Sequence, residues 1–128
     1  MRFTLDEILK AGNHKKENVP VEVQRNLIDL IQRVNKLGFT PPMYCSSGYR
    51  TPEHNAKVGG AKKSAHVQGK AIDIADPQGK LKRYLMENSY LLKKYGLRME
   101  HPKCTGGLNG GWCHLDTIPV KYNRIFLA

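Results

Sequence analysis

Residues 64–76, SAHVQGKAIDIAD, pass from a polar loop into an apolar strand. Ile72 and Ile74 alternate with Asp73 in the second half of this stretch. Because successive side chains of a strand point to opposite faces of its sheet, we expect the two isoleucines in the core and Asp73 on the other face, in a cleft. His66 lies in the loop that leads into this strand. The stretch therefore predicts a strand whose polar face carries a carboxylate, preceded by an imidazole.

The N-terminal part of the chain predicts two helices. Thr4 and Glu7 match the capping-box pattern at the start of a short helix that ends near Gly12. Residues 20–37 repeat apolar residues with a helical period, and Gly38 marks the end of this second helix. Its apolar face consists of Val23, Leu27, Leu30, Ile31 and Val34. We expect that face to pack on the core.

Further helices and strands follow on both sides of residues 64–76. After a short run, YCSSGYR, Thr51 can cap a helix that Pro52 begins, so Arg50 lies at a strand-to-helix junction. Residues from about 77 to 95 look helical. Two strands are expected in LRMEH and WCHLDTI, on either side of the loop PKCTGGLNGG. The pattern predicts an α+β fold with a small, mostly antiparallel sheet flanked by helices.

The length and composition of the chain indicate one soluble domain covering residues 1–128. No apolar run approaches the roughly 18 residues of a membrane span. The N-terminal segment lacks the pattern of a secretory signal, so we expect synthesis in the cytoplasm and reduced cysteines. Three cysteines cannot all pair, although Cys104 and Cys113 can meet across a loop.

The net charge of +10 favours an encounter with any polyanion, whether nucleic acid or an anionic cell-wall polymer. The lysines are scattered, and they are not accompanied by an RNA-binding aromatic pattern or a zinc-finger spacing. A basic nucleic-acid-binding domain therefore rests on charge alone, and we expect no specific nucleic-acid partner.

Three residues have the chemistry and placement of a metal site. The segment WCHLDT alternates like a strand, which puts Trp112, His114 and Asp116 on one face. His114 can then join His66 and Asp73 as a third ligand. Two imidazoles and one carboxylate leave a coordination position open for water, as hydrolytic zinc sites require.

A resemblance to a known family strengthens this interpretation. Ser64, His66, Gly69, Ala71 and Asp73 match each fixed position of the motif S-x-H-x-x-G-x-A-x-D of the zinc D-Ala-D-Ala peptidases. That family includes D-alanyl-D-alanine carboxypeptidases, the dipeptidases of vancomycin resistance and phage L-alanyl-D-glutamate endolysins. The segments SGYR before this motif and WCHLD after it are also similar to elements of these enzymes.

The resemblance implies a fold, a cofactor and a substrate. The fold is the compact α+β one of these peptidases, also called Hedgehog-like, and a single Zn²⁺ is bound by His66, Asp73 and His114. Arg50 holds a substrate carboxylate or steadies the oxyanion. Ser64 bonds substrate or orients its loop, or is only a local turn hydroxyl. Trp112 is assigned with Arg50 and Ser64 to substrate binding.

The general base is where the chain departs from the family pattern. Relatives often carry an acidic residue or a histidine shortly before the last ligand, but Gly111 stands three positions before His114. Glu100, on the preceding strand, is our candidate because that strand can bring its carboxylate to the metal water. The alternatives are Asp116, which can instead support His114, and His101.

These observations favour a monomeric zinc metallopeptidase that hydrolyses a bond in the peptidoglycan stem peptide, as an endopeptidase or a carboxypeptidase. The lack of a signal suits a phage endolysin that reaches the cell wall after release, and the positive charge suits an anionic wall. No membrane partner is expected. The alternative is a non-catalytic zinc module with a basic binding surface, which the missing acid before His114 supports.

Overall fold

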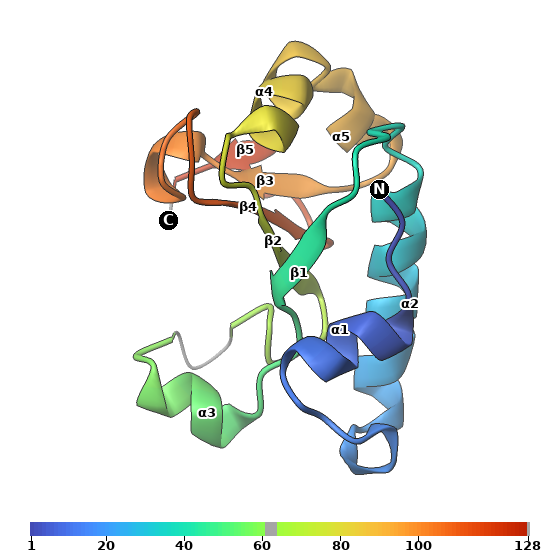
Figure 1. The fold of residues 1–128 in the computed structure, drawn as a ribbon. Helices are drawn as coiled ribbons and strands as arrows, with labels where there is room; N and C mark the ends of the chain where they lie inside the picture. Colours follow the sequence, from blue (N-terminus) through green and yellow to red (C-terminus); the bar gives the residue numbers. More distant parts are fainter. Residues whose placement is uncertain (61–63, 128) are drawn as a thin grey trace.

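The computed structural model describes residues 1–60 and 64–127, and it contains a five-stranded sheet with helices packed around it (Figure 1). The strands are β1 (Tyr44–Ser47), β2 (Ala71–Ala75), β3 (Arg98–Glu100), β4 (Trp112–Asp116) and β5 (Ile125–Phe126). The α-helices are α1 (Leu5–Ala11), α2 (Val21–Asn35), α3 (Pro52–Lys57), α4 (Lys80–Glu87) and α5 (Tyr90–Lys94). Two 3₁₀ turns, η1 (Lys16–Asn18) and η2 (Pro102–Cys104), complete these elements.

The strand order is β1-β2-β4-β3-β5, so β4 is the central strand and lies between β2 and β3. All neighbouring strands are antiparallel except β3 and β5, which run parallel. The predicted α+β class and mostly antiparallel sheet are confirmed. The short β5 was not predicted, because two residues leave too little pattern to distinguish a strand from a loop.

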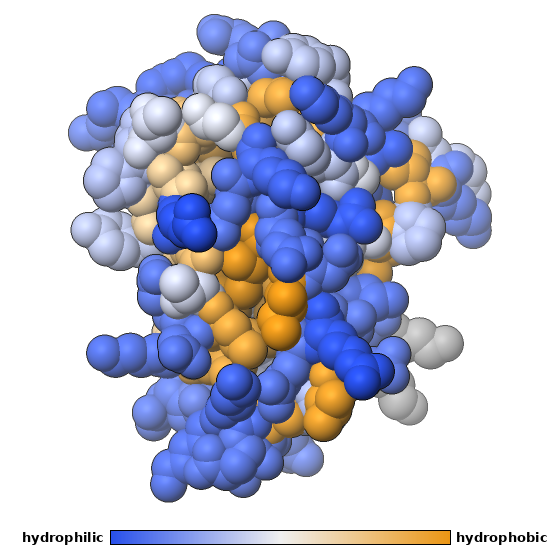
Figure 2. All heavy atoms as spheres, turned by 90° about the vertical axis from the view of Figure 1, so that its right-hand side faces the viewer, coloured by the Kyte–Doolittle hydropathy of each residue, from blue (hydrophilic) through white to orange (hydrophobic). Residues whose placement is uncertain are grey.

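One face of the sheet forms the hydrophobic core. Five side chains from its three inner strands are almost fully buried there: Ile72, Ile74, Met99, Cys113 and Leu115. Helix α2 contributes the five apolar residues that the sequence pattern predicted. Figure 2 shows the side of the molecule on which α2 lies, and this surface is mostly hydrophilic with apolar atoms exposed between the polar side chains. Val21 and Ile28 of α2 are exposed apolar residues. Asp73 and His114 alternate with the core residues and therefore lie on the opposite face of the sheet.

The loop before β2 is held against α2. Gly69 adopts a φ of +73°, and a Cβ atom there would lie 2.6 Å from the carbonyl oxygen of Val23. Only glycine permits both the left-handed backbone and this close approach. Asn26 also donates a hydrogen bond to the Gln68 carbonyl at 2.9 Å. These contacts fix the position of His66, three residues before Gly69.

The predicted helical region from about 77 to 95 consists of two helices rather than one. Helix α4 ends at Glu87 because Asn88 leaves the helical conformation, with φ −125° and ψ 44°, and its side chain donates to the Tyr84 carbonyl. Helix α5 begins after Ser89. The carboxylate of Asp76 accepts hydrogen bonds from the backbone of Leu81 and Lys82 in the first turn of α4.

Lys82 is a buried lysine that holds the loop before β4 in place. Its ammonium group donates to the carbonyls of Thr105 and Gly110, at 2.9 and 2.5 Å. The Thr105 carbonyl also accepts from the backbone N–H of Trp112, the first residue of β4. Lys82 therefore ties the loop before β4 to helix α4.

Replacing Lys82 by methionine is expected to lower the free energy of unfolding by about 2 to 4 kcal/mol, because buried carbonyls lose a charged donor. Urea unfolding measures this change, with Lys80→Met, at an exposed position in the first turn of α4, as the control. A loss no larger than that of the control would mean that the loop does not depend on Lys82.

The three cysteines are free, and Cys113 lies in the core, so Cys104 and Cys113 are not bonded to each other. No helix within residues 1–60 and 64–127 has the length and apolar character needed to cross a membrane.

Candidate metal centre

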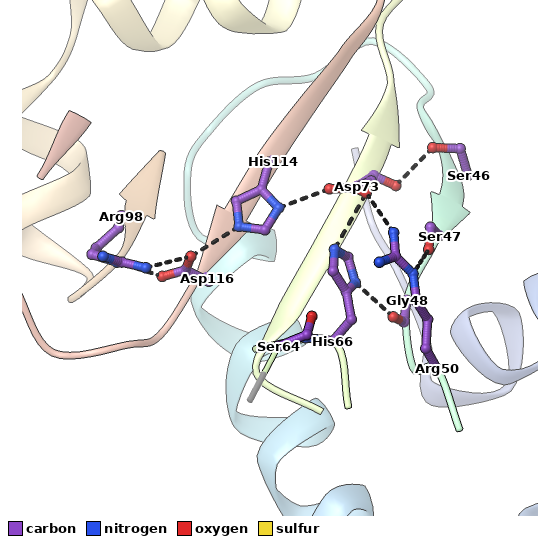
Figure 3. Close-up of polar contacts among 10 residues, drawn as sticks. All are labelled: Ser46, Ser47, Gly48, Arg50, Ser64, His66, Asp73, Arg98, His114 and Asp116. Carbon is purple, nitrogen blue, oxygen red and sulfur yellow. Dashed lines mark hydrogen bonds and ion pairs between the residues drawn. The ribbon is translucent and has the colours of Figure 1, made fainter. Parts of the chain in front are cut away.

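The three predicted ligands come together on the polar face of the sheet. Asp73 of β2 pairs directly with His114 of β4 in the antiparallel register. His66 approaches the same carboxylate from the loop before β2, which Gly69 and α2 hold in place (Figure 3). The donor atoms of His66, Asp73 and His114 all lie within 4.8 Å of one another.

The contacts of the Asp73 carboxylate show how the side chains of the three residues are oriented. One oxygen, Oδ1, lies 2.8 Å from Nδ1 of His114, and the other, Oδ2, lies 3.3 Å from Nε2 of His66. The two imidazole rings are 5.3 Å apart at an edge-to-face angle. His66 and Asp73 are buried, and His114 is partly buried. The three side chains thus converge on one point that is largely shielded from water.

Hydrogen bonds on the far side of each imidazole select the nitrogen that faces this point. Nδ1 of His66 donates to the Gly48 carbonyl at 2.7 Å, so Nε2 can present a lone pair. Nε2 of His114 lies 2.9 Å from the Asp116 carboxylate, which leaves Nδ1 for the same role. Metal-binding histidines typically have such a partner on their second nitrogen. Two imidazoles and a carboxylate with these supports fit a Zn²⁺ ion.

The charge balance of this cluster also favours a cation. Burial by itself would raise the pKa of Asp73, but hydrogen bonds from His114 and His66 hold that pKa well below its usual range. Burial would lower the pKa of His114, yet its bonds to Asp116 and Asp73 raise this pKa to about 9. A positive charge between the carboxylates is therefore stabilised, whether a proton or a metal ion supplies it.

Arg98 is a member of the site that sequence reasoning missed. Its guanidinium forms two hydrogen bonds to Asp116, at 2.8 and 3.0 Å, and Asp116 in turn contacts His114. The side chain of Asp116 is only 1 % exposed. The guanidinium also lies 4.0 Å from the ring centre of Phe126, which meets the His114 ring edge-to-face. Arg98 and Glu100 alternate with Met99 in the sequence, and this pattern could have placed Arg98 on the metal face, which is the face of the sheet that carries the three candidate ligands.

Asp116→Asn is expected to weaken zinc binding about tenfold to a hundredfold, because the amide no longer supplies the charge that orients His114. Competition with a coloured chelator measures the zinc affinity. Asp6→Asn, on the exposed side of α1, is the control. An unchanged affinity would show that His114 needs no support from Asp116.

Glu100 lies next to His114 on the metal face. Arg98 pairs with Asp116 and Met99 with Leu115, so the same register places Glu100 beside His114. Burial raises the pKa of the Glu100 carboxyl, which also senses the charges of His114 and Asp73. His101, the other candidate, accepts a hydrogen bond from the backbone of Lys103 and caps the turn η2. Asp116 is occupied by Arg98 and His114.

The remaining predicted residues surround the cluster. Arg50 lies beside Asp73, with 3.7 Å between Nη2 and Oδ2, and its Nε donates to Ser47 (Figure 3). The Ser64 hydroxyl accepts a hydrogen bond from the backbone of His66 at 3.2 Å, which is a local turn contact. Trp112 begins β4 opposite Ala75 and is 38 % exposed.

The α+β fold and the buried His–Asp–His cluster are the features expected of a metallopeptidase. The family model described as Peptidase M15 matches residues 1–102, so the chain belongs to this family of peptidases. This match includes His66 and Asp73, whereas His114 follows it, and its place in the cluster comes from the sheet register. No curated protein and no solved structure gave a significant match.

Proposed function

We propose that this protein is a zinc-dependent peptidase that hydrolyses a bond in the stem peptide of bacterial peptidoglycan. The observation that carries the proposal is the convergence of His66, Asp73 and His114 on one point, with Glu100 beside it. Membership of the peptidase M15 family supports the peptidase activity. The match to the D-Ala-D-Ala peptidase motif supports the peptidoglycan substrate.

Glu100 is the proposed general base. Its position beside His114 places a carboxylate at the edge of the metal cluster, and burial raises its pKa toward the range useful for taking a proton. His66, Asp73 and His114 would hold the zinc ion, which would supply Lewis acidity to the scissile carbonyl and to the attacking water. The carboxylate of Glu100 is placed to accept the proton of the attacking water and to pass it to the leaving amine.

Arg50 is proposed to bind the substrate beside the metal. It lines a cavity of about 500 Å³ together with Ser47, Thr51 and His54. A guanidinium in this position can hold a substrate carboxylate or stabilise the negative charge that develops on the carbonyl oxygen. Ser64 and Trp112 are proposed as further substrate contacts, Trp112 because it shares the metal face of β4.

The remaining parts of the proposal concern where the protein acts. The net charge of +10 supports binding to a wall that carries phosphate and carboxylate groups. We propose that the protein is made in the cytoplasm and reaches the wall after release, as a monomer, in the manner of a phage endolysin.

Removal and return of zinc tests the proposed activity. A chelator is expected to abolish the release of new amino groups from purified peptidoglycan, and added Zn²⁺ is expected to restore it. His66→Ala is expected to stay inactive with added zinc, while Gln32→Ala, on the exposed side of α2, keeps zinc-dependent activity. Stoichiometric zinc without any hydrolysis of several wall types would instead favour the non-catalytic zinc module.

A further inference from the structure

A second cavity lies beyond the metal centre, at the end of the sheet opposite to Arg50. This cavity, called the Phe126 cavity below, has a volume of about 290 Å³. Its lining consists of Arg98, Lys121, Tyr122, Asn123, Ile125, Phe126 and Leu127. These residues, apart from Arg98, belong to the C-terminal segment that follows the part matched by the family model.

Phe126 separates this cavity from the metal ligands. Its ring contacts the His114 ring, with 5.8 Å between the centroids, and it also borders the cavity. Glu100 pairs with Phe126 across β3 and β5. The strand registers therefore place four residues in one row across the sheet: Asp73, His114, Glu100 and Phe126. The Arg50 cavity and the Phe126 cavity therefore lie at opposite ends of one row of strands, with the candidate metal site between them.

The spacing of the strands sets how far a substrate must extend from the metal cluster to reach the Phe126 cavity. Neighbouring strands are about 4.8 Å apart, so the edge of β5 lies about 10 to 14 Å from the metal cluster between β2 and β4. An extended peptide covers about 3.4 Å per residue. A peptide held at the metal therefore reaches the Phe126 cavity with its third or fourth residue from the scissile bond.

The lining of the Phe126 cavity defines what it can bind. Lys121 and Arg98 supply positive charge, and none of the described residues that line it is acidic. Ile125, Phe126 and Leu127 supply an apolar wall. The guanidinium of Arg98 is already paired with Asp116, so Lys121 is the cation left to meet a ligand. An aliphatic residue with a carboxylate matches this combination of charge and apolar surface.

We propose that the Phe126 cavity is a remote substrate subsite, which binds a carboxylate-bearing residue about three residues away from the scissile bond. This inference rests on the proposed peptidase function. It defines the substrate as an extended peptide and excludes a free dipeptide as the preferred one. The subsite contributes to binding and leaves the reacting groups unchanged, so its loss raises KM more than it lowers kcat.

Binding of a soluble stem pentapeptide to zinc-loaded Glu100→Gln protein tests the proposal without turnover. Lys121→Glu, added to this protein, is expected to weaken binding about tenfold, because attraction of the carboxylate becomes repulsion. Lys93→Glu, on the exposed surface of α5, makes the same change of charge away from the cavity and is expected to have less than about a twofold effect. Calorimetry at a fixed ionic strength measures both affinities.

Shorter peptides show which part of the ligand occupies the subsite. For a tripeptide from one end of the stem, the effect of Lys121→Glu is expected to disappear, while it persists for the tripeptide from the other end. Equal effects of Lys121→Glu and Lys93→Glu, or an effect that is the same for both tripeptides, would overturn the subsite.

The two proposals can fail separately. If wild-type protein hydrolyses the pentapeptide with the same KM as the Lys121→Glu protein, the peptidase stands and the subsite is wrong. If the pentapeptide binds through Lys121 but is never hydrolysed, the cavity is a peptide-binding site and the enzymatic function is wrong.

Discussion

Glu100→Gln is expected to lower kcat for peptidoglycan hydrolysis by about a hundredfold to ten-thousandfold, the range typical of a general base. Glutamine keeps the size of the side chain but accepts no proton at neutral pH. The register of β3 and β4 places Glu100 beside His114, outside the three-ligand cluster, so zinc binding is expected to remain stoichiometric. Rates of amino-group release and the zinc content of the same sample measure the two properties together.

Two comparisons sharpen this experiment. Glu87→Gln, at the exposed end of α4, removes a carboxylate far from the metal and is expected to keep wild-type activity. His101→Ala tests the rival base and is expected to retain most activity, since His101 caps the turn η2. If His101→Ala loses more activity than Glu100→Gln, the roles of the two residues are reversed.

Asp73→Ala is expected to abolish activity and to weaken zinc binding by more than about a hundredfold, beyond the effect typical of supporting residues. The Asp73 carboxylate contacts both imidazoles and supplies the negative charge among the three ligands. Its removal also leaves Arg50 beside the histidines without the carboxylate that balances its charge. Zinc titration is carried out on Asp73→Ala and on Asp6→Ala, which removes one negative charge at an exposed position outside the cluster. The comparison distinguishes loss of a ligand from a general loss of negative charge.

The folded state of Asp73→Ala must be checked in the same samples. Asp73 lies on the polar face of β2 and contributes nothing to the apolar core, so circular dichroism is expected to match that of the wild type. Wild-type zinc affinity in a folded Asp73→Ala protein would remove Asp73 from the ligand set.

The sequence predicted the parts of the structure that depend on local patterns. The capping interaction of Thr4 with Glu7 and the cap of Thr51 on α3 are both present. The alternation in β2 and β4 also predicted which residues enter the core and which lie on the face of the candidate metal site. These features follow from backbone geometry and side-chain period, which a single sequence contains.

Other parts of the site depend on contacts between distant segments. Arg98 reaches Asp116 only because β3 and β4 pair in one register, and Gly48 reaches His66 because β1 and β2 are neighbours. Phe126 approaches His114 through a two-residue strand that carries no pattern of its own. Pairing register and short edge strands are properties of the tertiary fold, so local sequence patterns could not predict these contacts.

The masses of the fragments that zinc-loaded protein releases from purified peptidoglycan test the central claim most directly. The proposed mechanism predicts fragments with one new amino terminus and one new carboxyl terminus at a single type of peptide bond. It also predicts that Glu100→Gln protein with the same zinc content releases almost none. An intact stem peptide after prolonged incubation with zinc-loaded wild-type protein, on several wall types, would contradict the claim.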